Sequence, residues 1–340
     1  MIKMKEERKI LSYLSDHLGS GGSILEMTNE INKRYGPAYY SNIYNTTKKL
    51  EKAGIIEIRH EGNSRLIKLL MENPISIYRM AEIEIYKAQS LDLAKELLSA
   101  IMEIAITQRY NILSICALGT QKHTKINRLE LLVLIKDGRE HGILESLLKL
   151  ESTYNIKIDP VILTLRSFIK IMNSNELDFI KDLILDKNIL YNGEGFWELI
   201  RQNRFDSKYK RLAKSPQELT RGELAYNYNR LGFRLNEEIH PANKISIELT
   251  IFSMSINEEI RIKYGAIILL SKNMDKINWN YLYYLYKRYD ELGRLKGILH
   301  ILVDLGFDGD GAIQYYSSII KDTPEPFDNK IIKKYVELYG

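Results

Sequence analysis

Three apolar runs in the middle of the chain constrain its fold most: NILSICALG (111–119), NRLELLVLIKDG (127–138) and KIDPVILT (157–164). Each run contains a stretch of strand length that is almost continuously hydrophobic, whereas a strand with one face in water alternates apolar and polar residues. A helical pattern, GILESLLKLESTY (142–154), separates the second run from the third. This order predicts buried strands packed against helices, which is an α/β arrangement.

The residues in and around these runs resemble the minimal nucleotidyltransferases of the DNA polymerase β superfamily. Gly119 and Thr120 stand where that family has Gly-Ser, and LELLVLI (129–135) matches its strand of alternating aspartate and apolar residues. Asp159 falls on the strand of the family's third carboxylate, and ILYNGEGFWELI (189–200) is similar to the family's tail. The resemblance implies a loop that holds phosphates and three carboxylates that hold two Mg²⁺ ions.

Three departures from the family's pattern predict that this metal site is lost. Arg128 and Glu130 occupy the family's two aspartate positions, on one face of the strand. An arginine is a permanent cation that repels a metal ion, and the longer glutamate displaces its oxygen. The loop that begins at Gly119 is also shorter than the family's loop and lacks its second glycine. We therefore expect residues 91–205 to be a degenerate nucleotidyltransferase-like domain with no catalytic residue, metal or cofactor. An active enzyme would use Glu130, Asp159 and Mg²⁺.

A domain without its metal ions could still bind a phosphate or a nucleotide. The candidate residues are Gly119, Thr120, Lys122 and Arg128. They make the mouth of the site polar and basic, and an arginine at an aspartate position can hold a phosphate oxygen directly. The alternative is that the domain serves only as a scaffold or an oligomerisation surface.

The spacing of hydrophobic residues within segment 1–73 changes along the chain, from the period of a helix to the alternation of a strand. Three helical patterns come first, at 5–18, 24–36 and 38–53, and IIEIRH (55–60) and SRLIKLL (64–70) then flank a Glu-Gly-Asn turn. Three helices followed by a hairpin resemble the winged helix-turn-helix domain of archaeal and bacterial regulators. The resemblance implies that this segment binds DNA or, as some winged helices do, another protein.

The third helix of this segment is the predicted DNA-contact element. Ile43, Thr47 and Leu50 recur at helical spacing and are expected to face the core. A helix fits the major groove, where hydroxyls and amides can meet base edges and lysines can meet phosphates. The candidate contacts, on the opposite face and on the hairpin, are Tyr40, Ser41, Asn42, Tyr44, Asn45, Lys48, Lys49, Lys52, Asn63 and Arg65. The alternative is an ordinary solvated helix face.

A long helical pattern follows Asn73 and Pro74. Apolar residues recur every three to four positions from Ile75 to Gln108, with a break expected near Gln89. Residues 74–90 are therefore predicted to be a helical connector. Such a helix either packs onto the next domain or pairs two copies of the chain, because winged-helix proteins often bind paired half-sites.

Residues 206–340 are predicted to form an α-helical C-terminal domain. Ser215 is a candidate cap for a helix that ends at Gly232, and further helical patterns cover 246–270, 278–290 and 294–305. The last two of these resemble a helix-turn-helix without a wing. The tyrosine stripe in the pattern at 278–290 is expected to be core rather than a surface for stacking bases.

Composition narrows the class of protein without identifying a function. The chain has 340 residues, which favours two or three domains, and a net charge of +5, which is too small to indicate nucleic acid. The first 72 residues hold 12 basic and 9 acidic residues, so most of that excess lies there. The single cysteine, Cys116, excludes an internal disulfide and a cysteine-based zinc site, and the six histidines lack ligand-like spacing. The richness in Ile, Lys and Tyr resembles an archaeal, thermophilic proteome.

The sequence as a whole predicts an α+β multidomain protein with a winged helix, a nucleotidyltransferase-like α/β domain and a helical C-terminal domain. The expected function is transcriptional regulation by a DNA-binding pseudoenzyme. The alternatives are an active nucleotidyltransferase recruited by its winged helix and an antitoxin-like protein-interaction module. The expected partner is double-stranded DNA, with a nucleotide and a second copy of the chain as further candidates. No membrane-spanning run or signal peptide is recognisable, so a cytoplasmic location with no membrane partner is expected.

Overall fold

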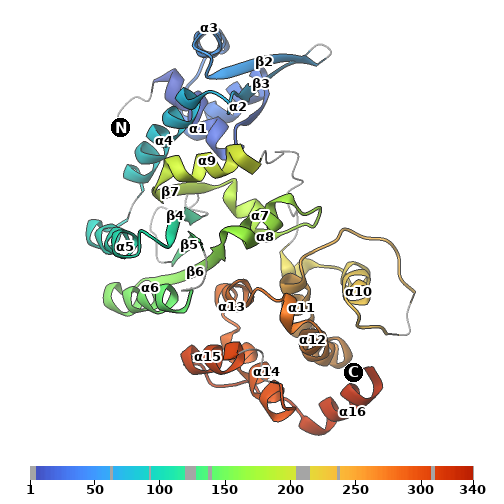
Figure 1. Ribbon diagram of the computed structural model, residues 1–340. Helices are drawn as coiled ribbons and strands as arrows, with labels where there is room; N and C mark the ends of the chain where they lie inside the picture. The colour runs from blue at the N-terminus through green and yellow to red at the C-terminus, as the bar shows by residue number, and fades with distance from the viewer. Residues whose placement is uncertain are drawn as a thin grey trace. The chain divides into compact units, whose positions relative to one another are not determined.

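The computed structural model describes residues 5–61, 64–91, 93–118, 128–136, 140–203, 215–235, 238–307 and 311–339. The expected mixture of helices and strands is confirmed (Figure 1). The chain forms two compact units. Unit 1 is Met1–Asn173 with Lys181–Tyr209, and unit 2 is Ser174–Ile180 with Lys210–Gly340. Unit 1 therefore holds the predicted segments 1–73 and 74–90 and most of 91–205.

The first part of unit 1 contains three helices and a small antiparallel sheet. Its elements are α1 (Glu6–Asp16), β1 (Ser20–Ser23), α2 (Ile24–Tyr35), α3 (Tyr40–Lys52), β2 (Ile56–Glu61) and β3 (Ser64–Leu69). The sheet order is β1-β3-β2, with β2 and β3 paired as the predicted hairpin. The expected three-helix order and the two strands of the hairpin are thus confirmed.

Strand β1 was not predicted, because its sequence, SGGS, lies between the first two helical patterns and carries no strand signal. Ser20 and Ser23 pair with Lys68 and Leu66 of β3. A side chain at Gly21 would place a Cβ 2.9 Å from the carbonyl oxygen of Ile67, so a glycine permits the close approach of the two strands. Pairing with β3, rather than the β propensity of serine and glycine, forms this strand.

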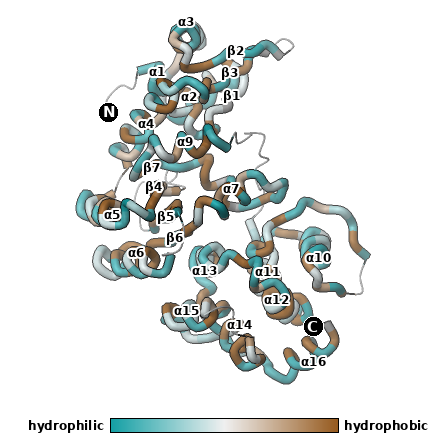
Figure 2. The backbone as a smooth tube through the Cα atoms, viewed as in Figure 1, coloured by the Kyte–Doolittle hydropathy of each residue, from teal (hydrophilic) through white to brown (hydrophobic). Residues whose placement is uncertain are grey.

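The second part of unit 1 is built on a four-stranded sheet. Its strands are β4 (Ile112–Leu118), β5 (Arg128–Ile135), β6 (Lys157–Thr164) and β7 (Lys187–Tyr191), in the order β6-β5-β4-β7. Strands β5 and β6 are parallel, and the other two pairs are antiparallel. The three strands expected from the apolar runs are present and largely buried, and β4 and β5 are hydrophobic along most of their length (Figure 2).

Helices surround this sheet and connect it to the first part. They are α4 (Pro74–Gln89), α5 (Lys95–Thr107), α6 (Glu140–Tyr154), α7 (Leu165–Asn173), α8 (Phe179–Ile184) and α9 (Gly193–Asn203). The break expected near Gln89 separates α4 from α5. Helix α4 contacts α1 on one side and β7 and α9 on the other (Figure 1). The predicted connector is therefore part of the core of unit 1.

The segment before β7 differs from the prediction. The residues ELDFIKDLILD (176–186) read as one helix with no strand signal after it, but α8 spans only Phe179–Ile184 and β7 begins at Lys187. Lys187 and Asn188, which weaken a sequence-based strand signal, are both buried in β7. Pairing with β4 outweighs their low β propensity.

Unit 2 is helical in its described residues. Its elements are η2 (Pro216–Glu218), α10 (Arg221–Arg230), α11 (Ile247–Ser255), α12 (Ile260–Lys272), η3 (Met274–Lys276), α13 (Trp279–Arg288), α14 (Leu292–Asp304), α15 (Ala312–Ile319) and α16 (Asn329–Tyr339). The tyrosines at positions 281, 283, 284 and 286 are buried and Tyr289, at the end of the stripe, is half-buried, so most of the tyrosines in this pattern are core as expected. The segment 174–180 joins the unit through a bridge between Leu177 and Ile245.

Two helix boundaries in unit 2 were predicted wrongly. The helix expected over 246–270 is two helices, α11 and α12, because the Asn257 side chain accepts a hydrogen bond from the Glu259 backbone N–H, 2.9 Å away, and starts a new turn. Ser215 caps only a 3₁₀ turn, and α10 begins after a second capping box formed by Thr220 and Glu223.

Within the described ranges, no helix combines the length and the apolar content needed to cross a bilayer.

Candidate nucleic-acid interface

The outer face of α3 carries all of the predicted DNA contacts that lie on this helix. Ile43, Thr47 and Leu50 are buried, as their spacing predicted. The remaining side chains point away from this core. Tyr40, Ser41, Asn42, Asn45, Lys49 and Lys52 are exposed, and Tyr44 and Lys48 are half-buried. The helix therefore presents hydroxyls and amides in its first half and ammonium groups in its second half.

The turn between α2 and α3 is fixed by side chains from the two preceding helices. The Asn32 amide donates to the carbonyl of Ala38 at 2.9 Å, and the Ala38 N–H donates back to the Asn32 side-chain oxygen at 2.6 Å. Lys9 of α1 donates to the carbonyl of Pro37 at 2.7 Å. These bonds satisfy backbone groups of the turn and set where α3 begins.

Aromatic side chains link the start of α3 to the hairpin. The rings of Tyr40 and Tyr44 are stacked, with their centroids 6.2 Å apart. Arg65 of β3 donates to the Tyr44 hydroxyl at 2.9 Å, and its guanidinium lies 5.5 Å from the centre of the Tyr44 ring. The predicted contacts on the helix and on β3 are thus brought together. The predicted contact at Asn63 lies outside the described residues.

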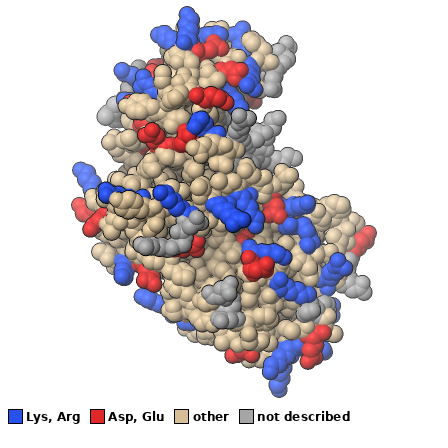
Figure 3. Space-filling model, in the orientation of Figure 1, with Lys and Arg blue, Asp and Glu red and all other residues tan. Residues whose placement is uncertain are grey.

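The positive charge of this surface is only partly compensated. Lys48 pairs with Glu51 at 2.8 Å, whereas Lys49 and Lys52 have no ion-pair partner among the described residues. Figure 3 shows Lys and Arg side chains around α3 with a few acidic side chains beside them. Exposed pairs such as Lys48–Glu51 are weak, so the lysines of this helix remain available to an anion.

The predicted catalytic residues lie together on one face of the four-stranded sheet. Glu130 of β5 is paired in register with Asp159 of β6, and Arg128 lies two residues before Glu130 on the same face. Arg128 donates from Nε to Oδ2 of Asp159, whose side chain is 0% exposed. The Arg128 side chain is 29% exposed. The buried carboxylate of Asp159 is therefore bound to a cation of this chain.

This ion pair changes what the strand face can do chemically. A divalent cation at Asp159 would lie beside a guanidinium that carries the same sign of charge. The other oxygen of Asp159, Oδ1, is buried and has no hydrogen-bond partner among the described residues. No three His, Cys, Asp or Glu side chains in the described ranges are grouped so as to hold a metal ion. Gly119, Thr120 and Lys122, the predicted phosphate-binding residues beside Arg128, lie outside those ranges.

A buried cluster of charges, which sequence analysis missed, lies where α1, α4 and β7 meet. Lys87 donates to Oδ1 of Asp16 at 2.8 Å and to Oγ of Ser15 at 3.0 Å. Lys187 donates to the backbone carbonyl of Ser15 at 2.9 Å. Glu84 accepts from the Ser15 hydroxyl and from the backbone N–H of Ile189. The only sequence signal was Glu84 and Lys87 on the apolar face of α4.

The pKa values in this cluster reflect burial and mutual attraction. Burial would raise the pKa of Asp16, but the charge of Lys87 and hydrogen bonds from Lys87 and Tyr35 outweigh burial and lower this pKa. Burial would lower the pKa of Lys87, but Glu84 and Asp16 raise it. Lys187, which is 0% exposed and lies 5.0 Å from the centre of the Trp197 ring, has a lowered pKa because burial dominates. The cluster holds the first part of unit 1 against the sheet.

Comparison of the chain with protein-family models, with curated proteins and with solved structures finds no match.

Proposed function

We propose that this protein binds double-stranded DNA through α3 and regulates transcription. In this proposal residues 1–73 are a winged helix-turn-helix domain, in which α3 enters the major groove and the β2–β3 hairpin is the wing. The four-stranded part is a nucleotidyltransferase-like domain that has lost its chemistry and serves as scaffold. The proposal also places the protein in the cytoplasm.

The observation that carries the proposal is the outer face of α3. A continuous helical surface of hydroxyls, amides and lysines, with Ile43, Thr47 and Leu50 turned inward, has the chemistry that a groove and its phosphates require. In the proposed complex Ser41, Asn42 and Asn45 meet base edges. Lys49 and Lys52 meet phosphates, and Arg65 reaches the adjacent backbone from the wing.

The ion pair between Arg128 and Asp159 supports a scaffold rather than an enzyme. A nucleotidyltransferase of the proposed family needs its third carboxylate free for Mg²⁺, and here that carboxylate is held by a guanidinium. We expect the protein with Mg²⁺ and α-³²P-labelled nucleotides to transfer no more label to protein, RNA or a small alcohol than the Glu130→Ala variant does. Label transfer that Glu130→Ala abolishes would establish the enzyme instead.

The test of DNA binding is the salt dependence of affinity. Each phosphate contact contributes a slope of about −0.9 to the plot of log affinity against log salt concentration. We expect the double variant Lys49→Ala, Lys52→Ala to bind duplex DNA more weakly and to flatten the slope by about 1.8, measured by fluorescence anisotropy on the full chain.

The matched control is the double variant Lys95→Ala, Lys149→Ala. It removes the same charge from exposed positions on α5 and α6 of the same unit. This control should leave both the affinity and the slope unchanged. Equal loss in both double variants would show a nonspecific charge effect and would refute the role of α3. If the affinity of the unmodified protein for DNA does not change with salt concentration, a protein-binding winged helix would be favoured.

A further inference from the structure

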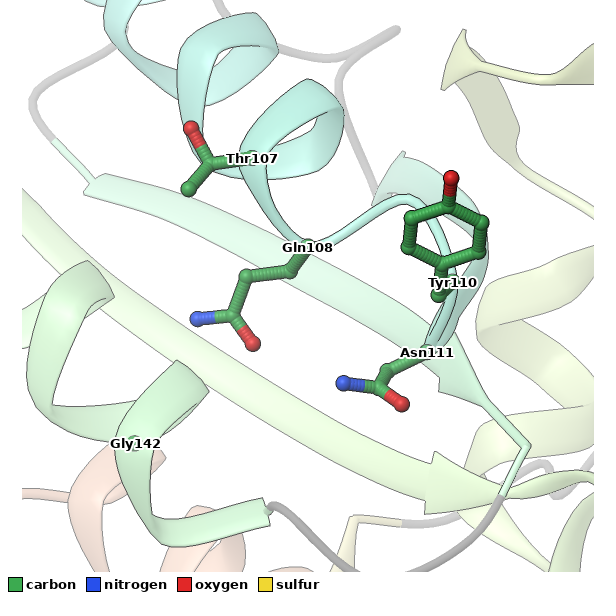
Figure 4. A pocket seen from close by; sticks show the side chains of 5 residues that line it. All are labelled: Thr107, Gln108, Tyr110, Asn111 and Gly142. Carbon is green, nitrogen blue, oxygen red and sulfur yellow. The ribbon is translucent and has the colours of Figure 1, made fainter.

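A pocket of about 670 Å³ lies beside the turn that leads from α5 into β4 (Figure 4). Its walls are formed by Thr107, Gln108, Tyr110 and Asn111, and by Gly142 in the first turn of α6. All five residues belong to unit 1. The volume is in the range of small-molecule sites, which is roughly 300–1,000 Å³.

The pocket lies away from the nucleotidyltransferase-like strand face. Ile112, at the start of β4, pairs with Ile135 at the end of β5. Arg128 and Glu130 lie at the other end of β5, where it pairs with the end of β4. A ligand in this pocket would therefore occupy the opposite end of the strands from the Arg128–Asp159 pair, and the site does not depend on the family resemblance.

The two amide side chains of the pocket converge and are not used by the fold. Figure 4 shows the amides of Gln108 and Asn111 pointing into the same space. Neither these amides nor the Thr107 hydroxyl has a hydrogen-bond partner in the described part of the chain. Two amides offer paired donor and acceptor groups, each with a free N–H₂ and a free carbonyl oxygen.

The turn that carries these amides is held by its backbone. The N–H groups of Asn111 and Ile112 both donate to the carbonyl of Gln108, at 2.8 and 2.9 Å, and the Lys136 N–H donates to the carbonyl of Asn111 at 2.9 Å. A ligand that binds the side chains would therefore not have to order the main chain, which lowers the entropic cost of binding.

We propose that this pocket binds an adenine base, carried by a nucleoside or nucleotide. An asparagine or glutamine amide matches the adjacent N6 donor and N7 acceptor of adenine with two hydrogen bonds. Tyr110 is 73% exposed and has the Arg109 guanidinium 5.2 Å from its ring centre on one face, so the other face of the ring is open for stacking. The described lining residues carry no charge, so the base and not a phosphate is the group that they recognise.

Gly142 offers a variant that fills the pocket without disturbing the fold. A Cβ built on Gly142 meets no atom within 4 Å, and the residue has no positive φ. Because Gly142 lines the pocket, a leucine there is expected to occupy part of the site without a clash. Gly222, in the first turn of α10 in unit 2, is equally open and does not line the pocket. Gly222→Leu is the matched control.

The test is isothermal titration of the full chain with adenosine, AMP and guanosine. We expect adenosine to bind with a Kd below about 1 mM, Asn111→Ala and Gln108→Ala each to weaken binding about tenfold, and Gly142→Leu to abolish it. Gly222→Leu should bind as the unmodified protein does. Guanosine, which has an acceptor in place of the N6 donor, should bind at least about tenfold more weakly.

Several results would overturn the proposal. Absence of heat with both adenosine and AMP, binding that survives Gly142→Leu, or equal affinity for guanosine would each contradict an adenine site here. Binding of AMP but not of adenosine would show that a phosphate, and not the base, is recognised. The DNA affinity of Gly142→Leu should be measured in parallel. If it is unchanged, the result for the pocket is independent of the proposed DNA binding by α3.

Discussion

Two groups of charged side chains in unit 1 behave in opposite ways. On α3, Lys49 and Lys52 are exposed and have no ion-pair partner among the described residues. On the strand face and at the junction of α1 with α4, Arg128, Asp16 and Lys87 are held by charges of the same chain. The difference teaches that position in the fold, and not residue type, decides whether a charge stabilises the protein or remains available to a partner.

The largest effect is expected from Asp16→Asn, which breaks the buried cluster. Removing the Asp16 charge leaves the buried Lys87 and Lys187 with Glu84 as the remaining acidic partner in the cluster, and should cost about 3 kcal/mol of unfolding free energy near pH 7. The folded-state pKa of Asp16 lies below 3.8, so the stabilisation is present above that pH and is lost as the pH falls through the folded value. Urea denaturation from pH 3 to 8 measures the loss.

The control for this variant is Asp275→Asn, at an exposed aspartate of unit 2. It should leave the unfolding midpoint unchanged at every pH. A constant difference between Asp16→Asn and the unmodified protein down to pH 3 would mean that the charge of Asp16 does not contribute.

A smaller loss is expected from Arg128→Ala on the strand face. The variant leaves the buried Asp159 carboxylate without its cation, at a cost of about 2 kcal/mol, which is less than for a fully buried pair because Arg128 is 29% exposed. Thermal unfolding measures the shift. Arg201→Ala, in an exposed arginine–glutamate pair on α9, is the control and should cause no measurable change. If Arg128→Ala is as stable as the control, the ion pair does not stabilise the sheet.

Asn45 belongs to the exposed face of α3, so Asn45→Ala should reduce the specificity of DNA binding rather than the stability of the fold. If Asn45 meets a base edge, its loss lowers discrimination between a selected duplex and a scrambled one about tenfold. The salt slope should not change, because no phosphate contact is lost. Competition binding with the two duplexes measures this ratio. An equal loss of affinity for both duplexes would mean that Asn45 contacts the DNA backbone instead of a base.

The smallest effect is expected from Tyr44→Phe. The ring that stacks on Tyr40 stays, and only the hydroxyl that accepts the Arg65 hydrogen bond is removed. Affinity for duplex DNA should fall about threefold, the effect of one exposed hydrogen bond. Tyr78→Phe, at an exposed tyrosine of α4, is the matched control and should bind as before. A loss greater than tenfold would mean that the hydroxyl itself contacts DNA.

The sequence predicted the helices and strands that are specified by the spacing of hydrophobic residues within one short segment. The spacing of Ile43, Thr47 and Leu50 located α3 to within two residues, because helical periodicity depends on neighbouring residues alone. The apolar runs located β4, β5 and β6 for the same reason. Strand alternation also placed Arg128 and Glu130 on one face, and Asp159 lies beside them there.

The features that depend on distant pairing could not be predicted. Strands β1 and β7 exist because β3 and β4 pair with them, and their own sequences contain Gly21 and Lys187, which disfavour strands. The ion pair of Arg128 with Asp159 requires that β5 and β6 be parallel and in register, which spacing does not reveal. The cluster at Asp16 joins residues more than 70 positions apart.

The cluster also has a practical consequence for expressing fragments. A truncation after residue 73 would keep Asp16 and Ser15 but delete Lys87 and Lys187, so that acidic and hydroxyl groups now enclosed by α4 and β7 would face solvent. Such a fragment would lose the buried contacts that hold α1 in place, so weak DNA binding by the fragment would say little about the intact protein. A piece that runs to residue 203 retains every member of the cluster and also α9, which packs against α4.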